Sequence, residues 1–316
     1  WSDTILFREM VELYDAHCMG KPDPLLPLRI QYRDFSEWQN RNDFEQEEAY
    51  WLTRLAGLPD EIRLPFDFQP GEERAFEAAV ETIHLDGEVL DALRTIAQAK
   101  ETTLANLLLT LFKLFLFRLT KQEDLCVGVN VASRNHADLE NLIGFFVNLL
   151  PIRTRLSSDM SFDTLFESVS KTAVEAYDHQ DYPFDLMVQK LNPTRTAGGL
   201  PLVNVLFAFQ NFVDVHVEVS MNGASSVGDT DLRIEAFPFS FKTSKFDLTL
   251  LAIDDADRLD LHVEYDAALF RCETIQSYLA TLVQFASTVA RSHPSAQSIM
   301  TRPNPVTTQK PDGTVR

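Results

Sequence analysis

The feature that most constrains the fold is a change of hydrophobic period near residue 76, after which short apolar runs alternate with helical stretches. "LCVGVNVA" (125–132) is typical of a buried strand, and the stretch 102–119 before it has the length and spacing of a helix. Strands that alternate with helices form layers, with the helices packed on a sheet. The sequence therefore predicts an α/β layered domain over residues 77–292. The expected strands are 80–85, 125–132, 148–156, 202–210, 231–237, 245–253 and 258–265, and the expected helices are 88–99, 102–119, 161–178, 183–191 and 272–291.

Residues 1–76 follow a different pattern. Apolar residues at helical spacing predict an amphipathic helix over 3–17 and a long helix with an aromatic face over 32–57. The prolines and the glycine of 58–76 indicate a connection between two units. The last segment, 293–316, is rich in Pro, Thr and Ser and predicts a linker or tail.

Charge and cysteine usage exclude several classes of partner. The formal charge of −19 opposes binding to phosphate backbones and anionic membrane surfaces, so we expect neither nucleic acid nor membrane as a partner. The most apolar run, 107–117, contains Lys113 and is much shorter than the ~20 residues that span a bilayer. Cys18, Cys126 and Cys272 are too far apart for a CxxC motif, which favours reduced thiols and a cytoplasmic protein.

Two histidines lie in sequences that resemble catalytic motifs. "HVEYD" places His262 and Asp266 four residues apart, as in the HxxxD of several acyltransferases. Strand alternation puts both on the polar face of 258–266, so we expect a solvated face and no catalytic role. "HQDYPFD" (179–185) joins two helices, and Asp181 is suited to cap the second, which predicts a structural corner. No GxSxG elbow, phosphate-binding glycine loop or metal-ligand cluster occurs in the sequence.

Five segments in order carry a family resemblance. They are "YRDFSEWQ" (32–39), "VGVNVASRNHADLENLIGFFVNLLPIRT" (127–154), "HQDYPFD" (179–185), "LNPTRTAGGLPLVNVLFAFQN" (191–211) and "SKFDLTL" (244–250). Together they resemble the later core motifs of the condensation domains of non-ribosomal peptide synthetases. The resemblance implies a chloramphenicol-acetyltransferase-like sandwich of two lobes. It makes 1–76 the last helices of the N-lobe with the inter-lobe connection, and 77–292 a complete C-lobe.

The resemblance also implies an activity and its partners. In the family, the amine on one carrier domain attacks the acyl or peptidyl thioester on another, which forms an amide. Both substrates are attached to phosphopantetheine arms that enter a tunnel between the lobes. An adenylation domain is an expected neighbour. The reaction needs a deprotonated amine and stabilisation of negative charge on the carbonyl oxygen. The family links both needs to an HHxxxDG motif, and it requires no bound cofactor or metal.

That HHxxxDG motif is missing from this chain, in which no two histidines are adjacent. In relatives, a helix like the one predicted here over 3–17 follows the HHxxxDG motif directly. We therefore expect the motif to lie upstream of Trp1. No catalytic residue is therefore assigned within the 316 residues, and the segment alone is predicted to be inactive. The alternative is a non-catalytic docking or scaffold module of the same fold that has lost its histidines.

Three side chains are candidates for contact with the arm or thioester: Asn148, Gln210 and Ser244. "IGFFVN" resembles the family's IGxFVN, whose Asn lies near the tunnel wall, and a neutral amide orients a substrate without burying a charge. The alternative for Asn148 is that it satisfies backbone groups where Pro151 interrupts a strand ladder. The position of Asn148 within the most recognisable motif favours the first interpretation.

Other motif residues are expected to be structural: Tyr32, Asp34, Trp38, Gly144, His179, Gln180, Asp181, Pro183 and Arg195. One departure concerns "RTAGGLPL", where relatives often show RDxSRxPL. Gly198 and Gly199 replace the Ser and Arg, which removes an anchoring contact expected of that loop. The segments that read FVN and then FQN favour a condensation domain over an epimerisation domain, which shares the fold.

Overall fold

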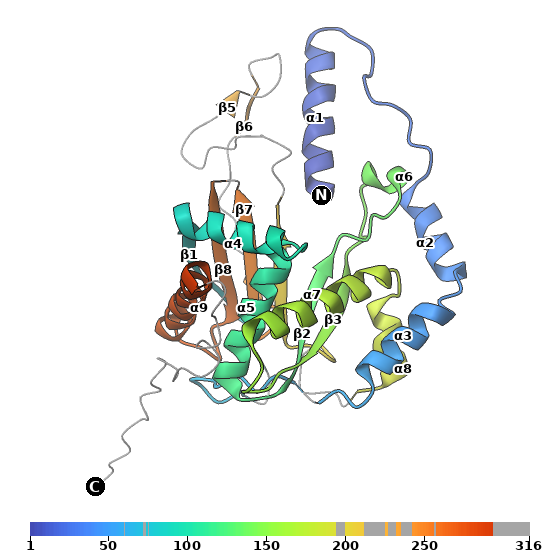
Figure 1. Cartoon of the computed structure of the whole chain (residues 1–316). Coiled ribbons are helices and arrows are strands. Elements are labelled where there is room, and N and C mark those ends of the chain that lie inside the picture. The colour runs from blue at the N-terminus through green and yellow to red at the C-terminus, as the bar shows by residue number, and fades with distance from the viewer. Residues whose placement is uncertain are drawn as a thin grey trace.

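The computed structural model describes residues 1–59, 61–71, 74, 76–193, 200–211, 225–226, 232–234, 242–255 and 257–292. Within them, the main feature is a six-stranded sheet of order β1-β8-β7-β4-β2-β3 (Figure 1). Strand β4 runs parallel to β2 and β7, whereas the other neighbouring pairs are antiparallel. This mixed sheet with packed helices confirms the predicted α/β class. The strands are β1 (Ala78–Asp86), β2 (Asp124–Val131), β3 (Asn148–Arg155), β4 (Val205–Gln210), β7 (Leu248–Asp255) and β8 (Arg258–Asp266).

The strands follow the two hydrophobic patterns expected of them. In β8, Leu259, Leu261 and Val263 are buried and alternate with partly exposed polar residues, as in a sheet with one solvated face. In β2, residues 125–129 are all buried, which fits a strand covered on both faces. A separate antiparallel pair, β5 (Ser225–Ser226) and β6 (Arg233–Ile234), overlaps the strand predicted at 231–237, most of which lies outside the described residues.

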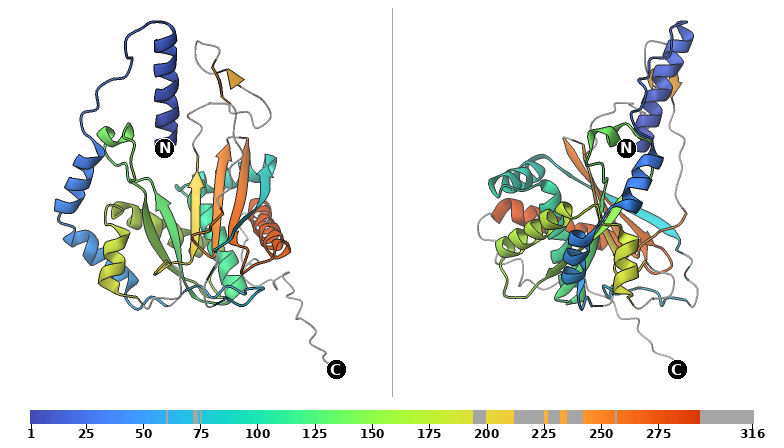
Figure 2. Two further views of the ribbon diagram at one scale, coloured as in Figure 1. Left: turned by 180° about the vertical axis from the view of Figure 1, so that it is seen from behind. Right: turned by 90° about the vertical axis from the view of Figure 1, so that its right-hand side faces the viewer.

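Four long helices pack on one face of the sheet: α4, α5, α7 and α9 (Figure 2). All of them were predicted from the sequence. Their bounds are α4 (Gly87–Ala99), α5 (Leu104–Thr120), α7 (Phe162–Asp178) and α9 (Cys272–Ser292). Thr103 begins α5, where its Oγ1 accepts a hydrogen bond from the backbone N–H of Asn106, and Lys121 ends it in the left-handed conformation. Two shorter helices are α6 (Ala137–Glu140), which was not predicted, and α8 (Phe184–Leu191), which was.

Helix α5 forms the centre of the hydrophobic core. Phe112, Leu114 and Leu116 are fully buried, as is the Lys113 side chain between them. The apolar run at 107–117 is therefore a core helix, as predicted. Among the described residues, no single helix is long and apolar enough to cross a membrane. Within the same residues, one pair of helices, α4 and α5, would together meet the length and composition needed for a membrane span, but the two helices are bent by 105° relative to each other.

The amino-terminal helices are α1 (Ser2–Cys18), α2 (Tyr32–Arg41) and α3 (Glu45–Leu55). The prediction of one long helix over 32–57 is wrong, because the chain turns extended at Asn42 and a new helix follows Phe44. Asp43 Oδ1 accepts a hydrogen bond from the backbone N–H of Glu45. Asn and Asp offer the backbone such local bonds, which compete with continuation of a helix.

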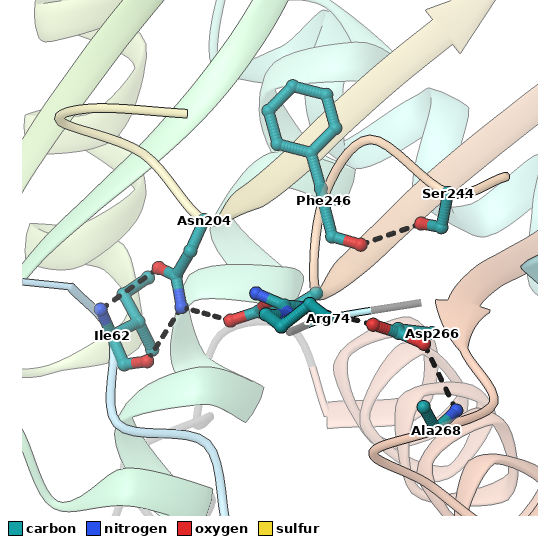
Figure 3. A network of polar contacts seen from close by, with 8 residues as sticks. Ile62, Arg74, Asn204, Ser244, Phe246, Asp266 and Ala268 are labelled. Atoms are coloured by element: carbon teal, nitrogen blue, oxygen red, sulfur yellow. Dashed lines mark hydrogen bonds and ion pairs between the residues drawn. The ribbon is translucent and has the colours of Figure 1, made fainter. Parts of the chain in front are cut away.

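A buried polar network fastens the connection that precedes β1 to the end of the sheet (Figure 3). The Arg74 guanidinium pairs with Asp247 at 2.7 Å and with Asp266 at 3.0 Å. Asn204 donates to Asp247 and to the carbonyl of Ile62, whose N–H it also accepts. The expectation that Asp266 lies on a solvated face is wrong, because its side chain is fully buried. The strand alternation fails there because Asp266 ends β8 beneath Arg74 and also accepts the N–H of Ala268.

Candidate functional site

A cavity of about 550 Å³ lies where α2, the start of β3 and the segment 180–185 meet. It brings together three motifs that are far apart in the sequence. The predicted residues that line it are Tyr32, Trp38, Asn148, Gln180, Asp181 and Pro183. The lining residues that were not singled out include Asn130, Ser133, Phe145, Val147, Leu200 and Lys245. Residues 145 and 147 lie within the quoted IGFFVN motif, which was the available signal for them.

Asn148, the first residue of β3, ties that strand to the segment 180–184. Its Nδ2 donates to the carbonyls of Gln180 and Tyr182, each at 2.8 Å. Its Oδ1 accepts the N–H of Leu149 at 3.0 Å and that of Phe184 at 3.1 Å. Two donors and two acceptor positions are all that a primary amide has. The amide of Asn148 is therefore fully used by backbone groups, although the side chain borders the cavity.

These bonds correct two details of the sequence interpretation. Asn148 supplies the side-chain oxygen at the start of α8, where the N-cap residue Pro183 makes no side-chain bond. The expected cap, Asp181, instead accepts a hydrogen bond from Nδ2 of Asn135 at 2.8 Å. The backbone groups that Asn148 satisfies lie in 180–184 and not beside Pro151, which stands in the edge strand β3.

Helix α2 packs its aromatic face on the IGFFVN segment. Tyr32 donates its hydroxyl to the carbonyl of Phe145 at 2.9 Å, and its ring meets Phe146 edge-on at 5.2 Å. A Cβ at Gly144 would collide with the Tyr32 ring, which explains the glycine. Asp34 accepts the N–H of Gln31 at 2.8 Å and so closes the first turn of α2. These contacts are consistent with the structural roles expected of Tyr32, Asp34 and Gly144.

The corner 179–183 is held by its own set of contacts. The His179 ring stacks on Tyr50 at 4.1 Å, and its carbonyl accepts a hydrogen bond from Trp51 Nε1. Gln180 Nε2 donates to the carbonyl of Tyr177. The buried Tyr182 donates to Glu48, and its burial together with this bond raises the pKa of Tyr182 to about 12.

The cavity wall is mainly neutral and partly apolar. The side chains of Trp38, Phe145 and Val147 are 46%, 78% and 49% exposed, so apolar surface faces the opening. Burial raises the pKa of Asp181, against the opposing effect of its hydrogen bond from Asn135. Such a cavity suits an uncharged chain that carries amide groups, because apolar walls bury its methylene groups while a few polar atoms orient it.

Arg134 holds the loop before the IGFFVN motif and was not singled out from the sequence. Its Nη1 donates to the carbonyls of Leu139 and Leu142, and its Nη2 donates to Ser2 Oγ at the start of α1. The guanidinium lies 4.1 Å from the centre of the Phe146 ring, and its burial lowers the pKa of Arg134. The start of α1 is thus connected to the wall of the cavity.

The remaining predicted residues lie elsewhere. Gln210 ends β4 and is exposed, and neither it nor Ser244 lines the cavity. The buried Ser244 donates its hydroxyl to the carbonyl of Phe246 at 2.6 Å. Contact of either residue with an arm stays a prediction. Arg195, with Gly198 and Gly199, lies outside the described residues.

The histidine of the acyltransferase-like pair also lies away from the cavity. His262 is half-buried in β8, with its Nδ1 2.9 Å from Thr82 Oγ1, and burial lowers its pKa. Within the described residues, no three His, Cys, Asp or Glu side chains are grouped as metal ligands. Cys18, Cys126 and Cys272 are all free, and burial raises the pKa of Cys126 to about 12.

Sequence comparison assigns the family. The family model described as "Condensation domain" matches residues 1–310. The chain is 36% identical over 286 residues to malpibaldin synthetase of Mortierella alpina and 33% identical over 293 residues to bacitracin synthase 3 of Bacillus licheniformis. The two alignments cover 89% and 92% of this chain but only 5% and 4% of those relatives. The chain therefore belongs to the condensation-domain family, and it spans a small part of the synthetases it matches.

Solved structures show the same fold. The X-domain from teicoplanin biosynthesis superposes with a TM-score of 0.81 at 23% identity, covering 94% of this chain and 68% of that one. A holo four-domain nonribosomal peptide synthetase bound to AMP and glycine gives a TM-score of 0.76 at 20% identity, over 92% of this chain and 22% of that one. These matches confirm the condensation-domain architecture predicted from the motifs.

Proposed function

We propose that this chain is the C-terminal part of a condensation domain that forms an amide between two carrier-bound substrates. The amine nitrogen attacks the thioester carbonyl, the carbon–sulfur bond breaks, and the released thiol takes up the proton. The observation that supports this proposal is the cavity of about 550 Å³, in which the IGFFVN, HQDYPFD and YRDFSEW segments meet. Its neutral wall fits a phosphopantetheine arm, and its apolar surface limits hydrolysis of the thioester by water.

The domain boundaries belong to the same proposal. Residues 1–76 are the last helices of the N-lobe with the connection, 77–292 are the C-lobe, and 293–316, which the structure does not describe, are a linker or tail. The HHxxxDG histidines would act from a segment upstream of Trp1. The partners would be an upstream and a downstream carrier domain, with an adenylation domain adjacent. The three free thiols fit a reducing, cytoplasmic setting.

A second candidate is a docking module of the same fold that catalyses no condensation. One observation favours it: a matched structure is a complex of the X-domain with OxyB from teicoplanin biosynthesis, at a TM-score of 0.81. The sequence that precedes Trp1 separates the two candidates. An intact HHxxxDG would favour the acyltransferase.

Trapping of a carrier arm tests the proposed use of the cavity. Val147→Cys, in a chain whose exposed Cys18 and Cys272 are replaced by serine, would place a thiol at the cavity wall. A carrier domain whose arm ends in a pyridyl disulfide would then form a mixed disulfide with Cys at 147 and release pyridinethione. Val80→Cys is the matched control, because Val80 is 53% exposed against 49% for Val147 and lies on β1 outside the cavity.

We expect trapping at 147 to be at least about tenfold faster than at 80, since a bound arm raises the local concentration of the disulfide. Free pantetheine pyridyl disulfide, which lacks the carrier, should show a smaller difference between the two sites. Equal rates at both positions with the loaded carrier would show that the arm does not use this cavity.

A further inference from the structure

A second cavity, of about 380 Å³, lies where the end of α3, the end of β3 and the middle of α7 meet. It is separate from the cavity proposed for the carrier arm, with which it shares no lining residue. Its wall is rich in arginine and hydroxyl groups, which come from Arg54, Arg153, Arg155, Thr154, Ser168 and Thr172.

The Arg54 side chain presents a donor that has no acceptor. Its Nη2 donates to Thr172 Oγ1 at 2.7 Å and lies 3.5 Å from Glu175, but its Nε is buried and has no partner in the described part of the chain. A buried N–H without a partner is costly, so such an atom indicates a missing acceptor. The Arg54 side chain also lines the adjoining cavity, where an anion would offer its guanidinium further acceptors.

Two buried threonine hydroxyls likewise have no acceptor among the residues that the structure describes. Thr172 Oγ1 receives its hydrogen bond from Arg54, and Thr154 Oγ1 receives one from Lys113 Nζ at 2.8 Å. Each oxygen therefore keeps a hydrogen to donate. Thr110 and Thr120, on α5, donate theirs to the carbonyl four residues earlier, whereas no such bond forms at Thr172. The wall of this cavity thus offers donors and few free acceptors.

The charges around the cavity are positive on balance. Arg153 is held by Asp124 in a two-point ion pair and also donates to three carbonyls at the end of α3, so its role is structural. Arg155 is 78% exposed and meets the same Asp124 only at 3.4 Å. The three arginines face two carboxylates, those of Asp124 and Glu175, and Lys171 lies 3.9 Å from Glu175. A net positive site is unusual on a chain of charge −19.

We propose that this cavity binds a phosphate group, held by Arg54 and Arg155 and by the hydroxyls of Thr154 and Thr172. A tetrahedral oxyanion is an acceptor in every direction, which is what an arginine fork and free hydroxyls require. The phosphate is either inorganic or the terminal group of a phosphopantetheine, and both sources present the same chemistry. The site does not depend on the proposed use of the arm cavity.

Calorimetric titration of the 316-residue chain with sodium phosphate at constant ionic strength tests the proposal. We expect one saturable site, weakened by about tenfold or more in both Arg54→Gln and Thr172→Val, because each removes a donor to the anion. Arg94→Gln is the matched control: Arg94 is 33% exposed against 38% for Arg54 and also pairs with a carboxylate, but it lies on α4. That variant should bind phosphate as the parent chain does.

A second titration distinguishes the source of the phosphate. 4′-Phosphopantetheine that binds about tenfold more tightly than phosphate, with pantetheine itself silent, would identify the free phosphate monoester of pantetheine as the ligand. Equal or weaker binding would identify free phosphate. No saturable binding to the parent chain, or unchanged binding in Thr172→Val, would overturn the proposal. The threonine variant decides the matter if Arg54→Gln does not fold, since valine preserves the shape of the side chain.

Discussion

Helices α1 and α5 have the same length, 17 residues, and opposite surroundings. Nearly every side chain of α5 is buried, whereas α1 exposes Leu6, Met10 and Leu13 at 52%, 47% and 40%. Figure 1 shows α1 projecting beyond the sheet, against which α5 lies. A contiguous apolar face on a helix marks a surface that another element covers. The described chain thus completes the surroundings of α5 but not those of α1, in line with the proposal that α1 belongs to the N-lobe.

The two regions are also fastened differently. Residues at the start of α1 hold the loop 134–146 through exposed or partly buried hydrogen bonds, such as that from Trp1 Nε1 to the carbonyl of Glu140 and those of Ser2 Oγ with Gly144. The connection before β1 is fastened by a buried network in which Arg74 bridges two carboxylates. Substitutions in the network should therefore cost far more stability than substitutions on α1.

The largest effect is expected at Asp266. Asp266→Ala would leave Arg74 with one of its two carboxylates and the N–H of Ala268 without its acceptor. Breaking a buried ion pair in this way costs about 3–5 kcal/mol of unfolding free energy, measurable by urea denaturation. Asp260→Ala, in the same strand, removes pairs with the exposed His84 and Arg258 and should cost less than about 1 kcal/mol. Equal losses of unfolding free energy would show that the buried network stabilises the fold no more than the exposed ion pairs do.

Substitution of one leucine in each helix tests whether α5 is packed in the core and α1 is exposed. Leu114 is fully buried in α5 and Leu6 is half exposed in α1. Leu114→Ala should lower the unfolding free energy by about 2–5 kcal/mol, because it leaves a cavity in the core. Leu6→Ala should change it by less than about 0.5 kcal/mol. A loss of several kcal/mol at residue 6 would mean that α1 is packed within this chain.

Lys113 provides a test that depends on pH. Burial lowers the pKa of Lys113 from 10.5 to about 7, although its ammonium donates to the carbonyl of Ile152 and to Thr154. Between these two values the unfolded chain binds the extra proton, so stability rises with pH; below about pH 7 the full cost remains. From about pH 7 to pH 9 the unfolding free energy should increase by roughly 2–3 kcal/mol relative to Lys113→Met, which lacks the titration. Parallel pH profiles for the two chains would contradict this pKa.

A smaller effect is expected at Asn148. Asn148→Ala and Asn148→Leu both remove the hydrogen-bond partner of the carbonyls of Gln180 and Tyr182 and of the N–H of Phe184. Each should cost about 1–3 kcal/mol of unfolding free energy. The turnover of an intact domain should then fall only with its folded fraction. Lost turnover with unchanged stability would instead favour the direct contact with the arm suggested by the sequence motif.

The sequence predicted most elements of residues 77–292 because their apolar residues follow the period of a helix or strand over a sufficient length. It did not predict the break at Asn42, where local hydrogen bonds outweigh a continuous helical pattern. It also did not predict the burial of Asp266, which depends on Arg74, 192 residues away. Periodicity describes faces of elements, whereas such contacts depend on how elements from distant parts of the chain are arranged.

The sequence predicted several residues that line the candidate site, but it did not predict their hydrogen-bond partners. The motifs named Tyr32, Asn148 and Gln180, and the cavity contains all three. Three of the four partners of the Asn148 amide lie 32–36 residues further along the chain, and nothing in the local pattern identifies them. The phosphate cavity was hidden for the same reason, because its arginines come from different elements of an acidic chain.

Amide formation between two loaded carrier domains, with the product measured by mass spectrometry, tests whether this chain is the C-terminal part of an amide-forming condensation domain. We expect no product with the 316-residue chain alone, since it has no HHxxxDG, and product when the chain is joined to an N-terminal condensation-domain segment that carries that motif. A histidine-to-alanine change in the joined motif should abolish the product. Amide formed by the 316-residue chain alone would contradict this expectation, because catalysis would then have to come from residues within the chain to which no catalytic role is assigned.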